Sequence, residues 1–218
     1  MNTDSKLKII NAKLVNEGNV FDGEILIVND RIYKIGSQIE VEGECEIYDA
    51  NGNYVLPGLI DDQVHFREPG LTHKATIATE SKAALAGGIT SFIEMPNTLP
   101  QTTTIEEWET KNKRAADTSF ANYAFMFGGT NDNLEEILAL YTKRVPALKL
   151  FLGSSTGNML VDNPDVLRKI FSNTDLVIAV HCEDEGTIRA NMQKAVEIYG
   201  EDIPMSQHPI IRSEEACY

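Results

Sequence analysis

The 218-residue chain has few cysteines, and it lacks both a long apolar run and an apolar N-terminal leader. Cys45, Cys182 and Cys217 are widely spaced and odd in number, which argues against a disulfide framework and for a reducing compartment. The longest strongly apolar run, residues 176–180, is far shorter than the roughly 20 residues that cross a bilayer. Residues 1–7 have no signal-peptide core. We therefore expect a cytoplasmic protein that does not engage a membrane.

Basic residues are also scarce, because 19 Lys and Arg face 33 Asp and Glu, giving a net charge of −14. A surface of that sign repels phosphate backbones, so no nucleic-acid partner is expected. The content of 42% apolar and 24% charged residues is that of a globular protein. A site for an anionic small molecule therefore requires a local basic feature in an acidic protein.

Residues 1–56 read as a small accessory lobe, sandwich-like and built of β-strands. Short β-patterned runs are separated by turn formers, and no helical periodicity occurs among them. Asn29-Asp30 is a plausible hairpin turn between two of these runs. The expected strands cover residues 7–10, 12–15, 24–28, 31–35, 47–50 and 54–56.

Residues 57–218 alternate between apolar strands and helix-like segments, which predicts a parallel sheet covered by helices. Strands are expected at 59–66, 89–95, 120–127, 147–152 and 176–181. Helices are expected at 76–86, 105–116, 133–142, 164–171 and 184–199. Gly87-Gly88 should end the first helix, and Asn131 or Asp132 should cap the third.

Two α/β architectures fit this pattern: an open doubly wound sheet and a TIM-like (β/α)₈ barrel. No G-x-G-x-x-G follows a strand, which weakens a dinucleotide-binding version of the open sheet. A barrel needs eight strands and roughly 250 residues, whereas only five strands are predicted here. The sheet is therefore either open or the front part of a longer, truncated barrel.

Two polar residues near the end of the predicted strand 59–66 are candidate metal ligands. Gln63 and His65 are two positions apart, so a strand places both on one face near its carboxyl end. Imidazole nitrogen is a common zinc ligand, and two neighbouring side chains can share one ion. The alternative is that His65 is a hydrogen-bonded core histidine.

Lys149 interrupts the otherwise apolar run 147–152, with Leu148, Leu150 and Leu152 on the opposite face. A lysine in a buried strand needs a partner or a lowered pKa. Its amine could then form a Schiff base, or react with carbon dioxide to give a metal-binding carbamate. Alternatively, the stem is buried and the ammonium pairs with an acid at the rim.

His181 ends the fifth predicted strand, and in a barrel it would meet His65 and Lys149 at one mouth. Cys182 should point the other way, and His73 and His208 read as surface residues.

Arg67 and Asn97 follow the first and second predicted strands. An arginine fork beside an amide suits a carboxylate ligand. The alternative for Arg67 is a salt bridge to Glu68 or Glu94.

At these residues the chain resembles the dihydroorotases of the cyclic amidohydrolase superfamily, essentially from end to end. The specific segments are VLPGLID at 55–61, HFREPG at 65–70, MPNT at 95–98, LKL at 148–150 and VHCE at 180–183. Hydantoinases and allantoinases share the metal ligands but typically lack the FREPG context. The resemblance implies a zinc-dependent barrel that interconverts N-carbamoyl-L-aspartate and dihydroorotate in pyrimidine biosynthesis.

By resemblance, His65 binds one Zn²⁺, the carbamate of Lys149 bridges two, and His181 binds the second. Arg67 and Asn97 hold the substrate carboxylate. The family usually has histidine at the position of Gln63, and an amide oxygen is a weak zinc ligand. The family's later ligand histidine and general acid/base aspartate are expected beyond residue 218, so we expect this chain to be part of a longer product and inactive alone.

Two functional alternatives to this reading remain open at the level of sequence. The enzyme could act on a hydantoin or allantoin ring instead of dihydroorotate. Gln63 also fits a non-catalytic homologue retained as a structural partner of another pyrimidine-pathway enzyme. A homodimer is compatible with each of these readings.

Overall fold

A computed structural model describes residues 4–140, 144–153 and 159–217 of the chain. The chain divides into two compact units, Met1–Gly58 and Leu59–Tyr218. Each unit has its own hydrophobic core, so each is described by itself.

The first unit is a five-stranded sheet with the order β3-β2-β1-β4, and β5 also pairs with β1. Its strands are β1 (Lys6–Asn16), β2 (Asn19–Val28), β3 (Arg31–Gly36), β4 (Glu46–Asp49) and β5 (Tyr54–Val55). β2 pairs with β1 and β3 antiparallel, whereas β4 and β5 run parallel to β1. The hairpin predicted at Asn29-Asp30 is confirmed between β2 and β3, and Asn29 has a φ of 57°.

Two sequence expectations for this unit were wrong. Residues 7–10 and 12–15 belong to one strand, β1, whose register shifts between Ile9 and Ala12. Asn11 has a φ of 53° at the shift, and asparagine tolerates this left-handed conformation, so the strand bends instead of ending. The described residues of the unit also form one sheet rather than a sandwich of two.

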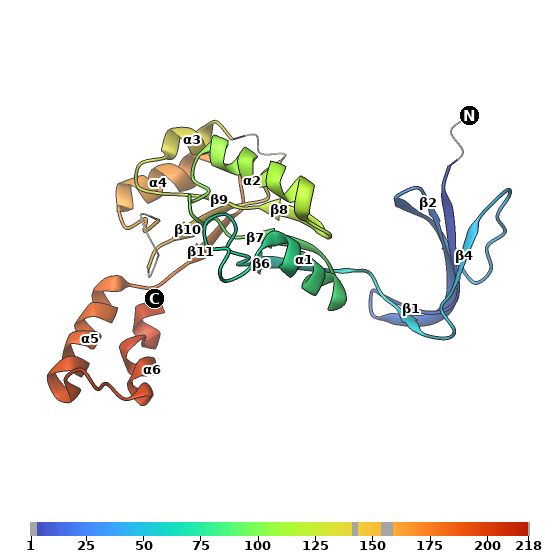
Figure 1. The fold of residues 1–218 in the computed structure, drawn as a ribbon. Helices are drawn as coiled ribbons and strands as arrows, with labels where there is room; N and C mark the ends of the chain where they lie inside the picture. The colour runs from blue at the N-terminus through green and yellow to red at the C-terminus, as the bar shows by residue number, and fades with distance from the viewer. Residues whose placement is uncertain (1–3, 141–143, 154–158, 218) are drawn as a thin grey trace. The chain divides into compact units, whose positions relative to one another are not determined.

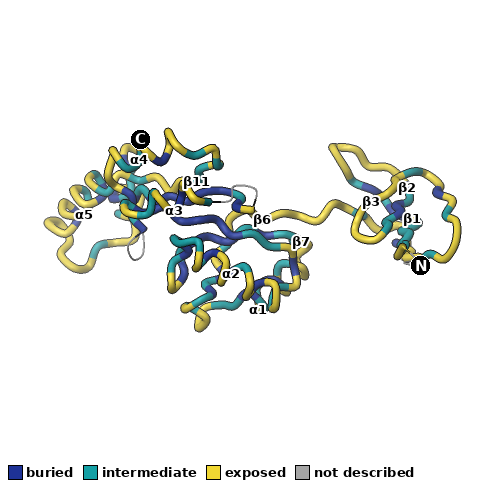
Figure 2. The backbone as a smooth tube through the Cα atoms, turned by 90° about the horizontal axis from the view of Figure 1, so that it is seen from above, coloured by how far each residue is buried: buried dark blue, intermediate teal, exposed yellow. Residues whose placement is uncertain are grey.

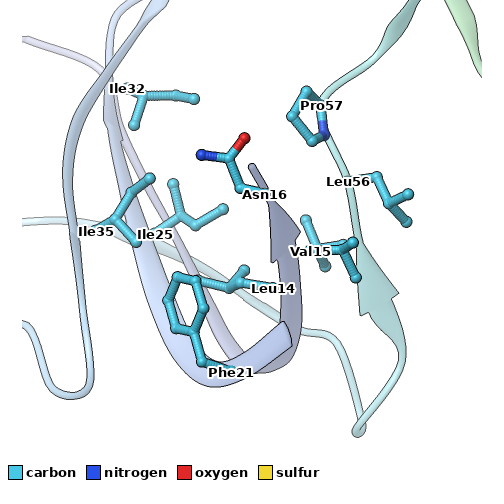
Figure 3. Close-up of a pocket in the computed structure, with 10 residues that line it drawn as sticks. Leu14, Val15, Asn16, Phe21, Ile25, Ile32, Ile35, Leu56 and Pro57 are labelled. Carbon is cyan, nitrogen blue, oxygen red and sulfur yellow. The ribbon is translucent and has the colours of Figure 1, made fainter. Parts of the chain in front are cut away.

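An apolar pocket of about 140 Å³ opens in this lobe. Figure 3 shows Leu14, Phe21, Ile25 and Ile35 around it, with the amide of Asn16 as a polar group among them. No charged side chain lines the pocket. The pocket therefore offers no ionic partner for a carboxylate or a metal ion.

The second unit alternates strands and helices, as predicted (Figure 1). Its strands are β6 (Leu59–Val64), β7 (Ile89–Glu94), β8 (Asn122–Phe125), β9 (Phe127–Gly128), β10 (Leu148–Phe151) and β11 (Ile178–His181). Its helices are α1 (Ile77–Ala86), α2 (Ile105–Thr118), α3 (Leu134–Leu138), α4 (Pro164–Asn173), α5 (Glu185–Tyr199) and α6 (His208–Ile211). Two 3₁₀ turns, η1 (Met205–Gln207) and η2 (Glu214–Cys217), flank α6.

All the strand pairs in this unit are parallel, with the orders β6-β7-β8 and β9-β10-β11. Met126 alone separates β8 from β9, so the expected strand 120–127 is divided into two short pieces. Its N–H donates to the carbonyl of Glu94 (3.0 Å), and the N–H of Phe127 donates to the carbonyl of Ala147 (3.1 Å). Met126 therefore passes the chain from one set of strands to the other.

The strands have two distinct faces. On the outer face, Phe92, Phe125, Leu148 and Leu150 pack against buried residues of helices α1 to α4, among them Trp108. On the opposite face, which we call the inner face, a separate cluster gathers Ile93, Met95, Met126, Ala147 and Ala179. Strands β9 and β10 are buried along their whole length, whereas β6 and β11 include exposed residues. Figure 2 shows buried, intermediate and exposed residues mixed along the helices of this unit.

Helix ends follow local sequence for α1 but not for α3. Thr76 caps α1 in a capping box with Thr79, and Gly87 ends the helix as predicted. The N-cap of α3 is Asn133 rather than Asn131 or Asp132, and its side chain makes no capping bond. The amide of Asn133 instead donates to the carbonyls of Thr103 and Gly128 (2.8 and 2.9 Å). α3 covers Leu134–Leu138, which is shorter than the predicted helix 133–142, and residues 141–143 lie outside the described residues.

Among the described residues, no helix is long and apolar enough to cross a membrane.

The outer-face core predicts a clear contrast between two substitutions. Leu148 is fully buried, so Leu148→Ala should lower the free energy of unfolding by about 3 kcal/mol through lost contacts and a cavity. Val177→Ala, at a side chain that is 69% exposed, should change it by less than about 0.5 kcal/mol. Urea denaturation followed by circular dichroism measures both, and equal effects would contradict this assignment of the core.

Candidate active site

His65 follows the last residue of β6, so the strand predicted to reach Phe66 ends two residues earlier. The neighbouring residues Val64 and Phe66 both contact the outer-face core, which leaves His65 on the inner side of the strand. Nδ1 of His65 lies 2.9 Å from Oδ1 of Asn97, in the loop after β7. Because the amide oxygen accepts only, Nδ1 carries the proton and Nε2 is left with its lone pair. His65 is hydrogen-bonded but exposed, so it is not a core histidine.

The surroundings of His65 favour its neutral form. Partial burial lowers the pKa of the imidazole, and the positive charges of Arg67 and Lys149 lower it further. The hydrogen bond with Asn97 opposes these effects without cancelling them. Lys149 of β10 is thus among the charges that lower the pKa of His65, which follows β6.

Lys149 lies on β10, a strand whose four residues are all buried, and its own exposed fraction is 3%. The predicted alternation is confirmed, because Leu148 and Leu150 pack in the outer-face core and Lys149 falls on the side of Ala147. Burial lowers the pKa of its ammonium group. Nζ lies 5.2 Å from the centroid of the Phe151 ring. Within the described part of the chain, no ion pair to Lys149 is present, so the expected rim carboxylate is not found.

His181 is the last residue of β11, at the carboxyl end as predicted. Its Cα pairs with that of Phe151, and the two rings lie 6.3 Å apart, so the Phe151 ring lies near both Lys149 and His181. Nε2 lies 3.2 Å from Oε2 of Glu183. Arg212 also donates to Glu183, and this hydrogen bond holds the pKa of the carboxyl below its usual range.

The side chain of Gln63 has fewer contacts with the candidate site than its position two residues before His65 predicted. The register of β6 shifts between Asp61 and Val64, so the simple alternation that would place Gln63 beside His65 is interrupted. Gln63 is exposed, and its backbone N–H donates to the side chain of Asp61 (3.1 Å). In the described ranges, no hydrogen bond joins the side chains of Gln63 and His65.

Arg67 and Asn97 are brought together by two loops. A guanidinium nitrogen of Arg67 donates to the carbonyl of Asn97 (3.5 Å). Both residues line a pocket of about 250 Å³, together with Leu71, Lys74, Thr98, Leu99 and Gln101. The salt bridge considered between Arg67 and Glu68 or Glu94 is not formed, because those carboxylates pair with Arg114 (3.1 Å) and Lys111 (3.0 Å). The cationic side chain of Arg67 therefore lies at a pocket instead of in an internal ion pair.

Sequence reasoning missed the buried pair of Glu94 and Lys111, which are 0% and 1% exposed. The lysine shares the buried side of α2 with Trp108 and Ala115, a spacing of three and four residues. A charge at a core position of an amphipathic helix is a signal that could have identified it.

The donor set partly fits a metal ion. Nε2 of His65 has a free lone pair, and the buried amine of Lys149 has a lowered pKa, which favours the neutral form that reacts with carbon dioxide. Among the described residues, however, no group of three or more His, Cys, Asp and Glu side chains could hold a metal ion. The chain thus supplies separate candidate ligands from three strands without a complete coordination shell.

Comparison with known proteins gives a consistent family. The model of the Dihydro-orotase-like family matches residues 52–200. A dihydroorotase of Methanosarcina acetivorans is 36% identical over 183 residues, which is 82% of this chain and 39% of that protein. A dihydroorotase of Lactococcus lactis subsp. lactis is 39% identical over 189 residues, which is 84% of this chain and 43% of that protein.

Among solved structures, the L-hydantoinase (dihydropyrimidinase) from Arthrobacter aurescens is similar to 98% of this chain. The TM-score is 0.89 at 26% sequence identity, and the match covers 48% of that protein. The chain therefore spans less than half the length of each of these relatives.

The electrostatic link between Lys149 and His65 predicts a pKa change. Lys149→Met removes a positive charge, so the pKa of His65 should rise towards its ordinary value of about 6.5. The lowered pKa of His65 means that protonation is less favourable in the folded than in the unfolded state. The contribution of His65 to the free energy of unfolding is therefore present above a pH of about 6.5 and is lost as the pH falls through the folded-state pKa. Ring-proton NMR of chelator-treated protein measures the titration.

Lys82→Met is the matched control, since Lys82 lies 4.4 Å from the Phe120 ring and is not among the charges that act on His65. An unchanged His65 titration in Lys149→Met would contradict the predicted coupling.

Proposed function

Because the chain belongs to the dihydroorotase-like family, we propose that it is part of a zinc-dependent enzyme that interconverts N-carbamoyl-L-aspartate and dihydroorotate. In this proposal, the parallel strands of the second unit are the first five of a (β/α)₈ barrel, with β8 and β9 counting as one. The observation that carries it is the buried Lys149 on the inner face, within electrostatic range of His65.

Three side chains are proposed to hold metal. Nε2 of His65 binds one zinc ion, because its Nδ1–H is held by Asn97. The neutral amine of Lys149 attacks carbon dioxide, a nitrogen–carbon bond forms and a proton leaves, giving a carbamate that ligates like a carboxylate. His181 would hold the second ion, and Nδ1 is the ring nitrogen that is not engaged with Glu183. Gln63, exposed and displaced by the register shift of β6, is at most an auxiliary oxygen ligand.

The chemistry is hydrolysis of a cyclic amide, and the reverse ring closure. Zinc held there would supply the activation of water for attack and the polarisation of the ring carbonyl. Arg67 and Asn97 hold the substrate carboxylate at the pocket that they line, which fixes the position of the ring. The leaving nitrogen requires a carboxylic acid as proton donor, a role for which we assign no described residue.

The pocket also bears on which ring is the substrate. The likeness to an L-hydantoinase keeps a hydantoin ring as the second candidate. An unsubstituted hydantoin carries no carboxylate, so it would leave the guanidinium of Arg67 without an ionic partner in the pocket. The pairing of Arg67 with Asn97 therefore favours dihydroorotate. Isothermal titration with dihydroorotate and with hydantoin tests the choice, and binding of hydantoin alone would overturn it.

Lys149 should control the metal content of the protein. Lys149→Ala is expected to remove bound zinc, because no carbamate can form, and added short carboxylic acids should restore part of it. Metal analysis by mass spectrometry measures both. Unchanged zinc content in Lys149→Ala would contradict the bridging role, whereas Lys169→Ala on α4 serves as a control that keeps wild-type zinc content.

Arg67 should control ligand affinity without affecting metal. Arg67→Met removes a charge-assisted contact to the carboxylate, so the Kd for dihydroorotate should rise about 10- to 100-fold. Zinc content should equal that of the wild type. Loss of zinc in Arg67→Met would show that Arg67 is wrongly placed, and calorimetry beside metal analysis separates the two outcomes.

A further inference from the structure

A buried ion pair lies behind the candidate site, on the outer side of the sheet. Glu94 is the last residue of β7, and Lys111 is in the second turn of α2. Their side chains are 0% and 1% exposed, and Nζ of Lys111 lies 3.0 Å from Oε2 of Glu94. Burial raises the pKa of Glu94 and lowers the pKa of Lys111, while their mutual attraction opposes both shifts.

Each partner of the pair also holds backbone next to the site. Oε1 of Glu94 accepts the backbone N–H of Arg67 (3.0 Å). Nζ of Lys111 donates to the carbonyl of Met95 (3.1 Å) and lies 3.5 Å from Oγ1 of Thr102. The pair therefore connects the loop after β6, which carries His65 and Arg67, to the loop after β7.

The loop after β6 needs such a restraint. Arg67 has a φ of 69°, in the left-handed region that is costly for a residue with a long side chain. The next residue, Glu68, is held in a similar way, because it accepts from Arg114 of α2 (3.1 Å) and from the backbone of Ile77 (2.8 Å). Two cations of one helix thus hold two consecutive residues of this loop through carboxylates.

We propose that Glu94 and Lys111 are positioning residues, which set the spacing of His65 and Arg67 relative to Asn97. The role of the site in binding dihydroorotate rests on the proposed function. The positioning itself rests on the contacts of Glu94 with Arg67 and of Lys111 with Met95. Glu94 acts through the Arg67 amide and Lys111 acts by holding the Glu94 carboxylate in place. Since a buried ion pair can often be replaced by apolar residues without loss of stability, stability alone does not account for it.

Two double variants separate positioning from stability. Glu94→Leu with Lys111→Met fills the same space but removes the acceptor for the Arg67 amide, and such apolar replacement is compatible with folding. Glu94→Gln with Lys111→Met also removes both charges but keeps a side-chain oxygen for that amide. Hydrogen exchange of the Arg67 amide, followed by NMR, and the Kd for dihydroorotate are measured in both, with urea denaturation to correct for stability.

We expect the leucine variant to exchange the Arg67 amide at least tenfold faster and to bind dihydroorotate at least tenfold more weakly. The glutamine variant should return both values to within about threefold of the wild type, because the acceptor is retained. Glu109→Gln is the matched control, since Glu109 is also on α2 and its ion pair with Arg144 is half-exposed. It should leave the Arg67 amide unchanged.

Wild-type exchange and affinity in the leucine variant, or failure of glutamine to rescue, would overturn the positioning role. If the leucine variant does not fold, the wild-type protein still decides, because an Arg67 amide that exchanges at the unfolded-chain rate contradicts the bond to Glu94. Absence of dihydroorotate binding by the wild type overturns the proposed function instead. The exchange rate of the Arg67 amide tests the ion pair independently of that result.

Discussion

The ion pair of Glu94 and Lys111 joins the parallel strands to the helical layer at the point where the candidate site begins. Burial removes the water that would hydrate both charges, which costs free energy. Hydrogen bonds to the backbone offset part of this cost, because Glu94 accepts from the N–H of Arg67 and Lys111 donates to the carbonyl of Met95. The hydrogen bond between His65 and Asn97 depends on these two loops lying together. The outer side of the sheet thus supports the chemistry proposed for its inner side.

Lys149 is the second buried lysine, and burial affects its ammonium group in a different setting from that of Lys111. Lys111 has a carboxylate within 3.0 Å, whereas Lys149 faces Phe151 at 5.2 Å and has no ion-pair partner among the described residues. Burial lowers the pKa of both ammonium groups. The carboxylate of Glu94 opposes the pKa shift of Lys111, whereas no neighbouring carboxylate among the described residues opposes the shift of Lys149. This difference is what makes Lys149 a candidate for chemistry and Lys111 a candidate for support.

Much of the fold was predictable because it depends on local periodicity. The alternation of Leu148 and Leu150 with Lys149 placed that lysine on the correct face, and Thr76 and Gly87 bounded α1 as expected. The errors occur where a distant contact outweighs local preference. The side chain of Asn133 bonds to the carbonyls of Thr103 and Gly128 instead of capping α3, which the local sequence did not predict. The pairing of β6 with β7 likewise has a register shift between Asp61 and Val64, which the sequence did not predict.

The sequence by itself determined the parallel α/β pattern and the residue types at the strand ends, because strand periodicity and the chemistry of histidine and lysine are local properties. Only the tertiary structure decided which charges are paired. Glu94 is 17 residues from Lys111 and 27 from Arg67 along the chain, yet it contacts both. A sequence pattern reports which side chains share a face of one element. It does not report which side chain of another element meets them, because that depends on how helix α2 packs against the sheet.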